Sequence, residues 1–291
     1  MADDLETPRQ APSRSADGPG VPVTLTIAGS EATGGAGAQA DLKTFQSLGT
    51  FGMVALTCIV SFDPKAGWGH RFVPIDPQVI ADQLEAQFAT YPVAAVKIGM
   101  LGTPATIETV AGVLDGLGDA GVARAHLVVD PVLICKGQEP GAALDTDTAL
   151  KELILPRAGF VTPNHFEAMA LSGMSSIDTV ADLEEAARRI HDLSGAAVLA
   201  KGGVRLAGPD AVDVFCDGST LEVLAAPKVG EVAVSGAGCT LAAAVTAELA
   251  KGADARDAAV AAKAFVTRAI AERMPSRAPF DAVRQPVDWS S

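Results

Sequence analysis

The stretch Ser235-Gly236-Ala237-Gly238-Cys239-Thr240 stands directly before a long alanine-rich run, residues 241–251, that is typical of a helix. The first backbone N–H groups of a helix have no partner within it, and they lie at the positive end of the helix dipole. Gly236 and Gly238 carry no side chain that would keep an anion away. The stretch therefore predicts an anion-binding helix start that suits a phosphate group. An ordinary glycine-rich turn before a helix has the same pattern, so the rest of the chain has to decide.

Cys239 stands at the mouth of this predicted anion hole, where we expect the helix start to lower the pKa of its thiol. The other three cysteines are Cys58, Cys135 and Cys216. The four show neither CxxC spacing nor a histidine at the distance typical of zinc fingers. We therefore expect reduced thiols and a cytoplasmic protein.

The composition bounds the class of protein. The chain has 291 residues, of which 48% are hydrophobic and 20% charged, enough for one large α/β core. Its net charge of -13 argues against a surface for nucleic acid or an anionic membrane. No apolar run reaches the roughly 18 residues that a membrane span needs. Residues 1–20 are polar and lack the apolar core of a signal peptide, so we expect a disordered tail there.

Strand-like and helix-like segments alternate along the rest of the chain. Short apolar runs at 23–28, 53–61, 94–98, 125–129, 159–162 and 196–200 suit buried parallel strands. Helical patterns separate them, and Asp217-Gly218 marks a hairpin between 211–216 and 221–225. This order predicts one α/β domain over 21–275, with a doubly wound, mostly parallel central sheet, helices on both faces and an antiparallel hairpin at one edge. Residues 276–291, with two prolines, are expected to be a second loose end.

A second glycine-rich loop, residues 29–37, follows the first predicted strand and leads into a helix at about 38–48. Open α/β sheets bind ligands at the carboxyl ends of their strands, where this loop lies. The loop lacks the GxxxxGK[ST] pattern, which excludes a P-loop. It holds four glycines, which is more than a tight turn requires.

Several chemically active residues follow the later strands. Asp130 stands at the tip of the fourth strand, where it suits either Mg²⁺ or a helix cap. Asn164 and Glu167 have the spacing of a capping box, and they could also reach Mg²⁺ through water. Lys201 stands before Gly202 and Gly203, a combination that offers charge and N–H groups to a nucleotide.

Two loops are candidate covers over this edge of the sheet. Residues 62–70 combine Phe62, Trp68 and His70, which suggests a flap over a flat ring, although a lone loop histidine is often only solvated. Residues 133–141 read as a mobile loop, and Cys135 lies at its centre. A thiol in such a loop is unusual, because free cysteines are mostly buried.

Six motifs occur in the order typical of ribokinase-like kinases: AGSEATGGAGAQADLKTF at 28–45, KIGMLG at 97–102, VVDPV at 128–132, TPNHFEA at 162–168, KGG at 201–203 and SGAGCT at 235–240. The chain resembles the branch of hydroxymethylpyrimidine (phosphate) kinases and their relatives, the pyridoxal kinases, over about residues 23–274. The resemblance implies a ribokinase-like fold and transfer of the ATP γ-phosphoryl group to a small heteroaromatic alcohol. It also implies Mg²⁺ as a cofactor and a homodimer, with the hairpin edge as a candidate interface.

The resemblance also implies roles for single residues. The N–H groups of Gly236, Ala237, Gly238 and Cys239 would stabilise the transferring phosphoryl group. A separate hypothesis rests on the two thiols: Cys239 could assist deprotonation of the hydroxyl or add to the aldehyde of pyridoxal as a hemithioacetal, and Cys135 could relay a proton, because their two motifs should meet on closure. Asp130 and Glu167 would organise Mg²⁺. The ATP-binding set would be Asp130, Asn164, Glu167, Lys201, Gly202 and Gly203. The substrate ring would be surrounded by Gly29, Ser30, Asp41, Phe62, His70 and Met100.

The choice within this branch depends on a few positions. Hydroxymethylpyrimidine kinases typically carry a glutamine where Phe62 stands, whereas Phe62, His70 and Cys135 resemble the pyridoxal-kinase variant. Ser235 replaces a usual histidine, and Glu31 replaces a common aspartate. Phosphorylation of pyridoxal, pyridoxine and pyridoxamine at the 5′-hydroxymethyl group is therefore the first hypothesis. A hydroxymethylpyrimidine/phosphomethylpyrimidine kinase of thiamin biosynthesis is the alternative, and a non-catalytic vitamin-sensing relative is a third.

Overall fold

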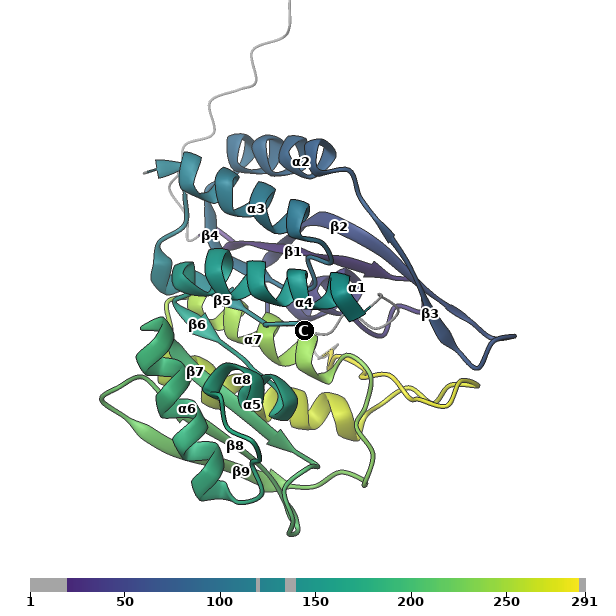
Figure 1. Ribbon diagram of the computed structural model, residues 1–291, viewed down its shortest axis with the longest axis vertical. Coiled ribbons are helices and arrows are strands. Elements are labelled where there is room, and N and C mark those ends of the chain that lie inside the picture. Colours follow the sequence, from purple (N-terminus) through teal and green to yellow (C-terminus); the bar gives the residue numbers. More distant parts are fainter. Residues whose placement is uncertain (1–19, 119–120, 134–139, 288–291) are drawn as a thin grey trace, which may run out of the picture.

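A nine-stranded sheet forms the centre of the computed structural model, which describes residues 20–118, 121–133 and 140–287 (Figure 1). In space the strands follow the order β3-β2-β1-β4-β5-β6-β7-β8-β9. Their bounds are β1 (Val23–Glu31), β2 (Phe51–Asp63), β3 (Gly69–Pro74), β4 (Val93–Ile98), β5 (Leu127–Val129), β6 (Phe160–Val161), β7 (Ala197–Gly203), β8 (Asp210–Cys216) and β9 (Leu221–Pro227).

Most of the sheet is parallel. Strand β1 pairs in parallel with both β2 and β4, and the parallel ladder continues through β5 and β6 to β7. Strands β8 and β9 add an antiparallel hairpin beyond β7, which confirms the predicted fold class. At the opposite edge, β3 is antiparallel to β2, where the sequence predicted only a flap loop. Its exposed, glycine-containing sequence hides the alternation that marks a half-buried strand.

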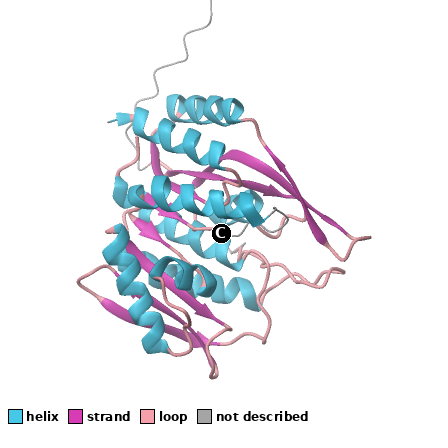
Figure 2. Cartoon of the chain, in the orientation of Figure 1, coloured by secondary structure: helices cyan, strands magenta, loops and turns pink. Residues whose placement is uncertain are grey.

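Helices cover both faces of the sheet (Figure 2). Helices α7 and α8 pack on one face around Phe160 and Phe215, and α1 lies beside α7. Helices α2, α3, α5 and α6 contribute to the larger core on the other face. The bounds are α1 (Gly37–Ser47), α2 (Pro77–Thr90), α3 (Pro104–Gly116), α4 (Pro140–Ala149), α5 (His165–Ser172), α6 (Val180–Ser194), α7 (Ala237–Ala250) and α8 (Ala255–Ala271).

Short helical turns complete the described chain, at Arg124–His126, Leu150–Ile154 and Leu155–Arg157. None of the helices in the described ranges is both long and apolar enough to cross a membrane.

The expected loose end at the C-terminus does not hold for residues 276–287. Ala282 pairs with Met274 and forms a bridge with Ser235, while Val283 and Gln285 are buried. The Gln285 side chain donates a 3.0 Å hydrogen bond to the Thr240 hydroxyl in α7. Composition alone suggested a tail, but these backbone pairings hold the segment against the core.

Candidate active site

The sheet reverses its winding next to β1, since β2 lies on one side of it and β4 on the other. Ligands of open α/β sheets bind at such a switch point, outside the carboxyl ends of the strands. The carboxyl ends of β1, β4 and β5 lie at this edge, and the loops that follow them begin at residues 32, 99 and 130. The predicted site residues after these strands are therefore brought to one edge of the sheet.

The predicted anion hole forms the start of α7. Gly236 takes the N-cap position with φ 79°, and no side chain in the described part of the chain caps the helix there. A Cβ atom on Gly236 would lie 1.8 Å from the carbonyl oxygen of Gly35, so only glycine fits. The two glycine-rich loops, which are far apart in the sequence, thus touch at this point. The N–H of Ala237 donates a 3.3 Å hydrogen bond to the carbonyl of Val234, which leaves the N–H groups of Gly238 and Cys239 to serve an anion.

Gly238 faces the charged centre of the site. A Cβ atom at this position would lie 3.3 Å from Nζ of Lys201 and 4.0 Å from Oδ2 of Asp130. The helix start, a lysine and a carboxylate therefore meet around one small space. This arrangement can hold a phosphoryl group between N–H donors and an ammonium group.

Asp130 and Lys201 form a buried ion pair, with Nζ of Lys201 3.1 Å from Oδ1 of Asp130. The Thr162 hydroxyl donates a second hydrogen bond of 3.2 Å to the same oxygen. Burial alone would raise the pKa of Asp130, but Lys201 and Lys97 outweigh it and hold that pKa below its usual value. Asp130 is therefore a carboxylate at neutral pH, with Oδ2 directed to the side of Gly238.

Asn164 and Glu167 form the capping box that their spacing predicts. The Asn164 side chain accepts from the backbone N–H of Glu167 at 3.0 Å, and Oε2 of Glu167 accepts from the N–H of Asn164 at 2.7 Å. Burial and the charge of Asp130 raise the pKa of Glu167 to about 8. A bound cation would relieve this repulsion between two buried carboxylates, so Asp130 and Glu167 suit Mg²⁺ as a partial ligand set. Within the described residues, no cluster of three or more His, Cys, Asp or Glu residues forms a complete metal site.

A third buried polar group, Asp41, lies beneath the first glycine-rich loop. Its Oδ2 accepts from the Thr26 hydroxyl at 2.7 Å and from Nζ of Lys97 at 2.8 Å. Both members of this ion pair are almost fully buried, and Oδ1 of Asp41 has no partner among the described residues. Lys97 was not among the predicted site residues, although it begins the KIGMLG motif and is the one charge in an otherwise apolar strand.

Cys239 lies close to this pair, but its thiol does not behave as predicted. Burial raises the pKa of Cys239 to about 11, even though Lys97 and a hydrogen bond from the Gly37 N–H act in the opposite direction. The expectation of a lowered pKa for Cys239 is therefore wrong. Cys239 is half-buried, and the loss of water around its sulfur costs the thiolate more than the nearby positive charge returns.

The residues expected around the substrate ring fall into three places. Gly29 lies against Cys58 and Met100: a Cβ atom there would be 2.4 Å from Sγ of Cys58 and 3.9 Å from Sδ of Met100. The Ser30 hydroxyl accepts a 2.8 Å hydrogen bond from Gln39. Asp41 lies deeper, and Phe62 and His70 lie further out on the β2–β3 hairpin.

Glu31 has a structural role in the first glycine-rich loop. Its carboxylate accepts hydrogen bonds from the backbone N–H groups of Thr33, Gly35 and Ala36, and from the Thr33 hydroxyl. It therefore fixes the loop that touches Gly236.

The β2–β3 hairpin presents rings toward the site. Phe62 and His70 are directly opposite each other in the ladder, with ring centroids 4.7 Å apart. His70 and Phe72 share one face of β3, and the Phe72 ring packs on Gly102, where an added Cβ would be 2.6 Å away. Because Gly102 follows Met100 in the KIGMLG motif, this face of the hairpin is directed to the β4 end of the site.

The tip of this hairpin is strained. Trp68 has φ 63° and is the one non-glycine residue with positive φ in the described ranges. A bulky side chain in the left-handed region costs on the order of 1–3 kcal/mol and persists only where its surroundings hold it. Outside the hairpin, the Trp68 ring contacts the ring of Phe280, and the two ring centroids are 6.0 Å apart.

Two glycines predicted to bind ATP lie beside Lys201 at the end of β7. Gly202 stands at a register shift and packs against the carbonyl of Val212, while Gly203 has open space around it. The proposed relay residue Cys135 lies outside the described residues.

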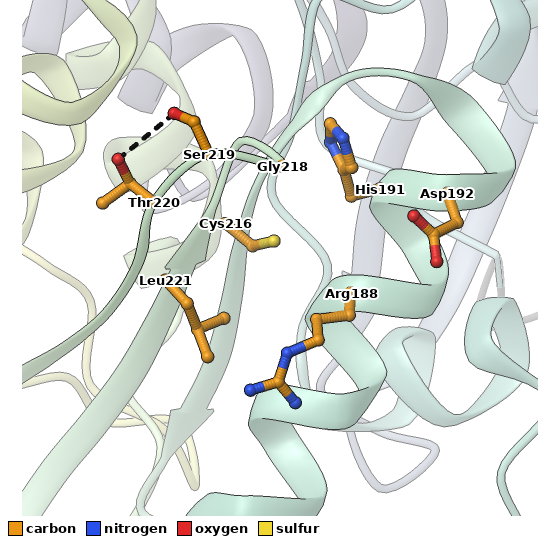
Figure 3. Close-up of a pocket in the computed structure, with 8 residues that line it drawn as sticks. All are labelled: Arg188, His191, Asp192, Cys216, Gly218, Ser219, Thr220 and Leu221. Atoms are coloured by element: carbon orange, nitrogen blue, oxygen red, sulfur yellow. Dashed lines mark hydrogen bonds between the residues drawn. The ribbon is translucent and has the colours of Figure 1, made fainter.

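A separate cavity of about 190 Å³ lies between α6 and the turn from β8 to β9 (Figure 3). Its lining includes Arg188, His191 and Cys216, and Cys216 pairs with Val198 near the amino end of β7. The cavity therefore lies near the amino end of β7, whereas Lys201 lies near its carboxyl end. None of the predicted site residues lines it.

Comparison with known proteins places this geometry in a family. The family model described as phosphomethylpyrimidine kinase matches residues 31–284. A pyridoxine kinase of Bacillus subtilis is 46% identical over 86% of this chain and 91% of its own length. A pyridoxal kinase of Staphylococcus aureus, solved with AMP-PCP and pyridoxal, is 38% identical with a TM-score of 0.82, over 91% of this chain and 93% of its own. A phosphomethylpyrimidine kinase structure from Clostridium difficile is 35% identical, with a TM-score of 0.71 over 86% and 99%.

Proposed function

The chain belongs to the phosphomethylpyrimidine kinase family, and from this premise we propose that it transfers the γ-phosphoryl group of ATP to the 5′-hydroxymethyl group of pyridoxal, pyridoxine or pyridoxamine. The observation that carries the proposal is the meeting of Gly238 with Lys201 and Asp130 at the start of α7. A loose phosphoryl-transfer transition state needs positioning and charge neutralisation more than strong base catalysis. In this proposal the N–H groups at the start of α7, those of Gly238 and Cys239 first among them, and the Lys201 ammonium group supply both.

In this proposal the substrate ring lies between the loop after β1 and the β2–β3 hairpin. Gly29, Ser30 and Met100 form its inner wall, and Phe62 and His70 cover it from the hairpin. Phe62 offers an apolar face and no hydrogen bond, which favours pyridoxal over an aminopyrimidine. The similarity to pyridoxine and pyridoxal kinases supports the same choice.

Asp130 and Glu167 would hold Mg²⁺, and Asn164, Lys201, Gly202 and Gly203 would contact the ATP phosphates. Mg²⁺ neutralises phosphate charge when it is bound. The Lys201 ammonium group keeps Asp130 ionised, and Glu167 is buried at the same end of the strands.

We propose that Cys239 reacts with the aldehyde of pyridoxal. The sulfur would form a bond to the aldehyde carbon, the C=O π bond would break, and the thiol proton would move to the aldehyde oxygen. Because the thiol of the ligand-free protein is protonated at neutral pH, proton transfer accompanies the addition, and Cys135 is the proposed relay. Cys239→Ala that kept the wild-type kcat/KM for pyridoxal would refute this covalent step.

A test of the proposed function is ATP turnover with pyridoxal, with the product identified as the 5′-phosphate by its absorbance and mass. Lys201→Met is the matched variant, because it removes the ammonium group beside Gly238 and keeps most of the volume. We expect turnover by the wild-type protein and a loss of at least about 100-fold in Lys201→Met. Absence of ATP turnover with any ring alcohol would support the vitamin-sensing alternative.

The alternative substrate is hydroxymethylpyrimidine or its phosphate. Two findings support this alternative: the matching family is described as phosphomethylpyrimidine kinase, and the chain is similar to a phosphomethylpyrimidine kinase structure. Its distinguishing product is a pyrimidine diphosphate, which pyridoxal kinases have no need to form.

Two further properties belong to the proposal. We infer a homodimer, with the β8–β9 hairpin as its interface, because β9 is an edge strand and Val223 on it is 41% exposed. Light scattering of the wild-type protein and Val223→Lys tests this. A cytoplasmic location agrees with Cys58, Cys216 and Cys239, which are free thiols.

A further inference from the structure

Four aromatic rings from two distant parts of the chain form one cluster. Phe62, Trp68 and His70 come from the β2–β3 hairpin, and Phe280 comes from the C-terminal segment. The ring centroids of Phe62 and Phe280 are 5.0 Å apart with a 46° interplanar angle, and those of Trp68 and Phe280 are 6.0 Å apart at 83°. Figure 1 shows the yellow C-terminal loop beside the tip of this hairpin.

The segment that carries Phe280 is anchored next to it on both sides. Met274 and Ala282 exchange backbone hydrogen bonds of 2.8 and 3.2 Å, which close the loop around Phe280. The Ser276 hydroxyl donates to the carbonyl of Phe280, and the Ser276 N–H donates to the Asp281 carboxylate. The Phe280 ring is therefore presented from a closed loop rather than from a free end.

The same segment is bonded to the anion hole. The Ser235 N–H donates to the carbonyl of Asp281 at 2.9 Å, and the Val283 N–H donates to the carbonyl of Ser235 at 3.0 Å. Ala282 packs against Gly35, where an added Cβ would lie 2.7 Å from its methyl group. One short stretch thus makes three contacts: Phe280 touches the rings of the β2–β3 hairpin, Ala282 touches the first glycine-rich loop, and the residues around Ala282 bond to Ser235 beside the anion hole.

The cluster lies on the face of the hairpin that is turned toward the predicted substrate site. Phe62 and His70 are a directly opposed pair, and His70 shares its face of β3 with Phe72, which packs on Gly102 in the loop that follows Met100. The Phe280 ring contacts Phe62. Phe280 is half-buried, so part of its ring is exposed beside Phe62.

We propose that Phe280 is a specificity-determining residue of the kinase: it positions Phe62 and Trp68 over the substrate ring and links this cover to the anion hole at the start of α7. The inference rests on the proposed function and deepens it by assigning the outer wall of the ring pocket to the C-terminal segment. The contact of Phe280 with the Trp68 ring adds to the 2.8 Å hydrogen bond from the Trp68 N–H to the Asp63 carbonyl in holding the left-handed Trp68 at the hairpin tip. The ligand class is a flat heteroaromatic alcohol, because the apolar rings of Phe62 and Phe280 would pack against a flat ring.

The test compares steady-state kinetics of the wild-type protein with Phe280→Leu, which keeps apolar volume and removes the ring, and Phe280→Tyr, which keeps the ring. Phe51→Leu is a matched control, since Phe51 is an exposed aromatic residue that pairs with Tyr91 at the amino ends of the strands, 5.4 Å away. We expect Phe280→Leu to raise KM for pyridoxal about tenfold, as the loss of two ring contacts implies. KM for ATP should stay within about twofold in all variants.

Phe280→Tyr and Phe51→Leu are expected to retain a KM for pyridoxal within about threefold of the wild type. An active wild-type protein with an unchanged KM in Phe280→Leu refutes the role of Phe280 and leaves the proposed function intact. An equal rise of KM for ATP and pyridoxal also refutes it, because that result indicates a general structural effect. A wild-type protein that phosphorylates no ring alcohol refutes the proposed function, and the role of Phe280 with it.

Discussion

Replacement of Gly238 by alanine should separate activity from stability. Gly238 lies in the first turn of α7 with a helical backbone, so alanine fits its conformation. The added methyl group would lie 3.3 Å from Nζ of Lys201 and 4.0 Å from Oδ2 of Asp130, in the space assigned to the phosphoryl group. The substitution therefore fills the anion hole without breaking the helix.

Gly238→Ala should raise the free energy of unfolding and lower kcat. Alanine in place of a helical glycine stabilises by up to about 1 kcal/mol. Displacing the phosphoryl group from its donors should cost about 100- to 1,000-fold in kcat, or about 2.7–4 kcal/mol in the transition state. Gly236→Ala is the contrasting variant, since φ is 79° and the new Cβ would overlap the Gly35 carbonyl. We expect it to lose about 2–5 kcal/mol of stability.

The assay is urea unfolding together with kcat/KM for pyridoxal on the same preparations. Gly112→Ala is the matched control, because Gly112 lies inside α3 and an added Cβ meets nothing within 4 Å. It should gain stability and keep the wild-type kinetics. A Gly238→Ala protein with kcat/KM within about threefold of the wild type would refute the assignment of the anion hole.

Three further predictions concern buried charge. Lys97→Met should lower the free energy of unfolding in urea by about 3–5 kcal/mol, because it leaves Asp41 buried without its cation. The double variant Lys97→Met with Asp41→Asn should recover most of that loss. An equally unstable double variant would contradict the pairing. Alkylation of Cys239, followed by peptide mass spectrometry, should be slow at pH 7 and rise with pH toward about 11, since only the thiolate reacts; a midpoint below about 8.5 would show that burial does not control the thiol. Glu167→Gln should preserve the capping box with Asn164, and thus stability, while it raises the Mg²⁺ concentration for half-maximal turnover about tenfold; an unchanged Mg²⁺ requirement would exclude Glu167 from the metal site.

The sequence predicted the sheet well because its signals are local. Apolar runs bounded by glycine mark the parallel strands, and Asp217-Gly218 marks the β8–β9 hairpin. The candidate site followed from the same logic, since residues such as Asp130 and Lys201 stand at the ends of strands. Their ion pair needs only the parallel arrangement of β5 and β7 to form.

What the sequence could not predict depends on contacts between distant segments. Strand β3 is exposed and pairs only at the sheet edge, so its pattern resembles a loop. Lys97 reads as one polar residue in an apolar strand, and only the fold brings Asp41 to it. The pKa of Cys239 follows from burial, which no local pattern records. Phe280 stands in a stretch whose composition is typical of a tail, yet backbone pairing with Met274 and Ser235 holds it at the flap.

The most direct test of the account is kcat/KM for pyridoxal and for hydroxymethylpyrimidine, measured side by side on one preparation with saturating ATP and Mg²⁺. The account predicts a value for pyridoxal at least about tenfold higher, equivalent to about 1.4 kcal/mol in transition-state binding. This ranking would agree with the apolar cover formed by Phe62. The opposite ranking would contradict the account and would identify a thiamin-pathway kinase whose ring pocket does not depend on Phe62.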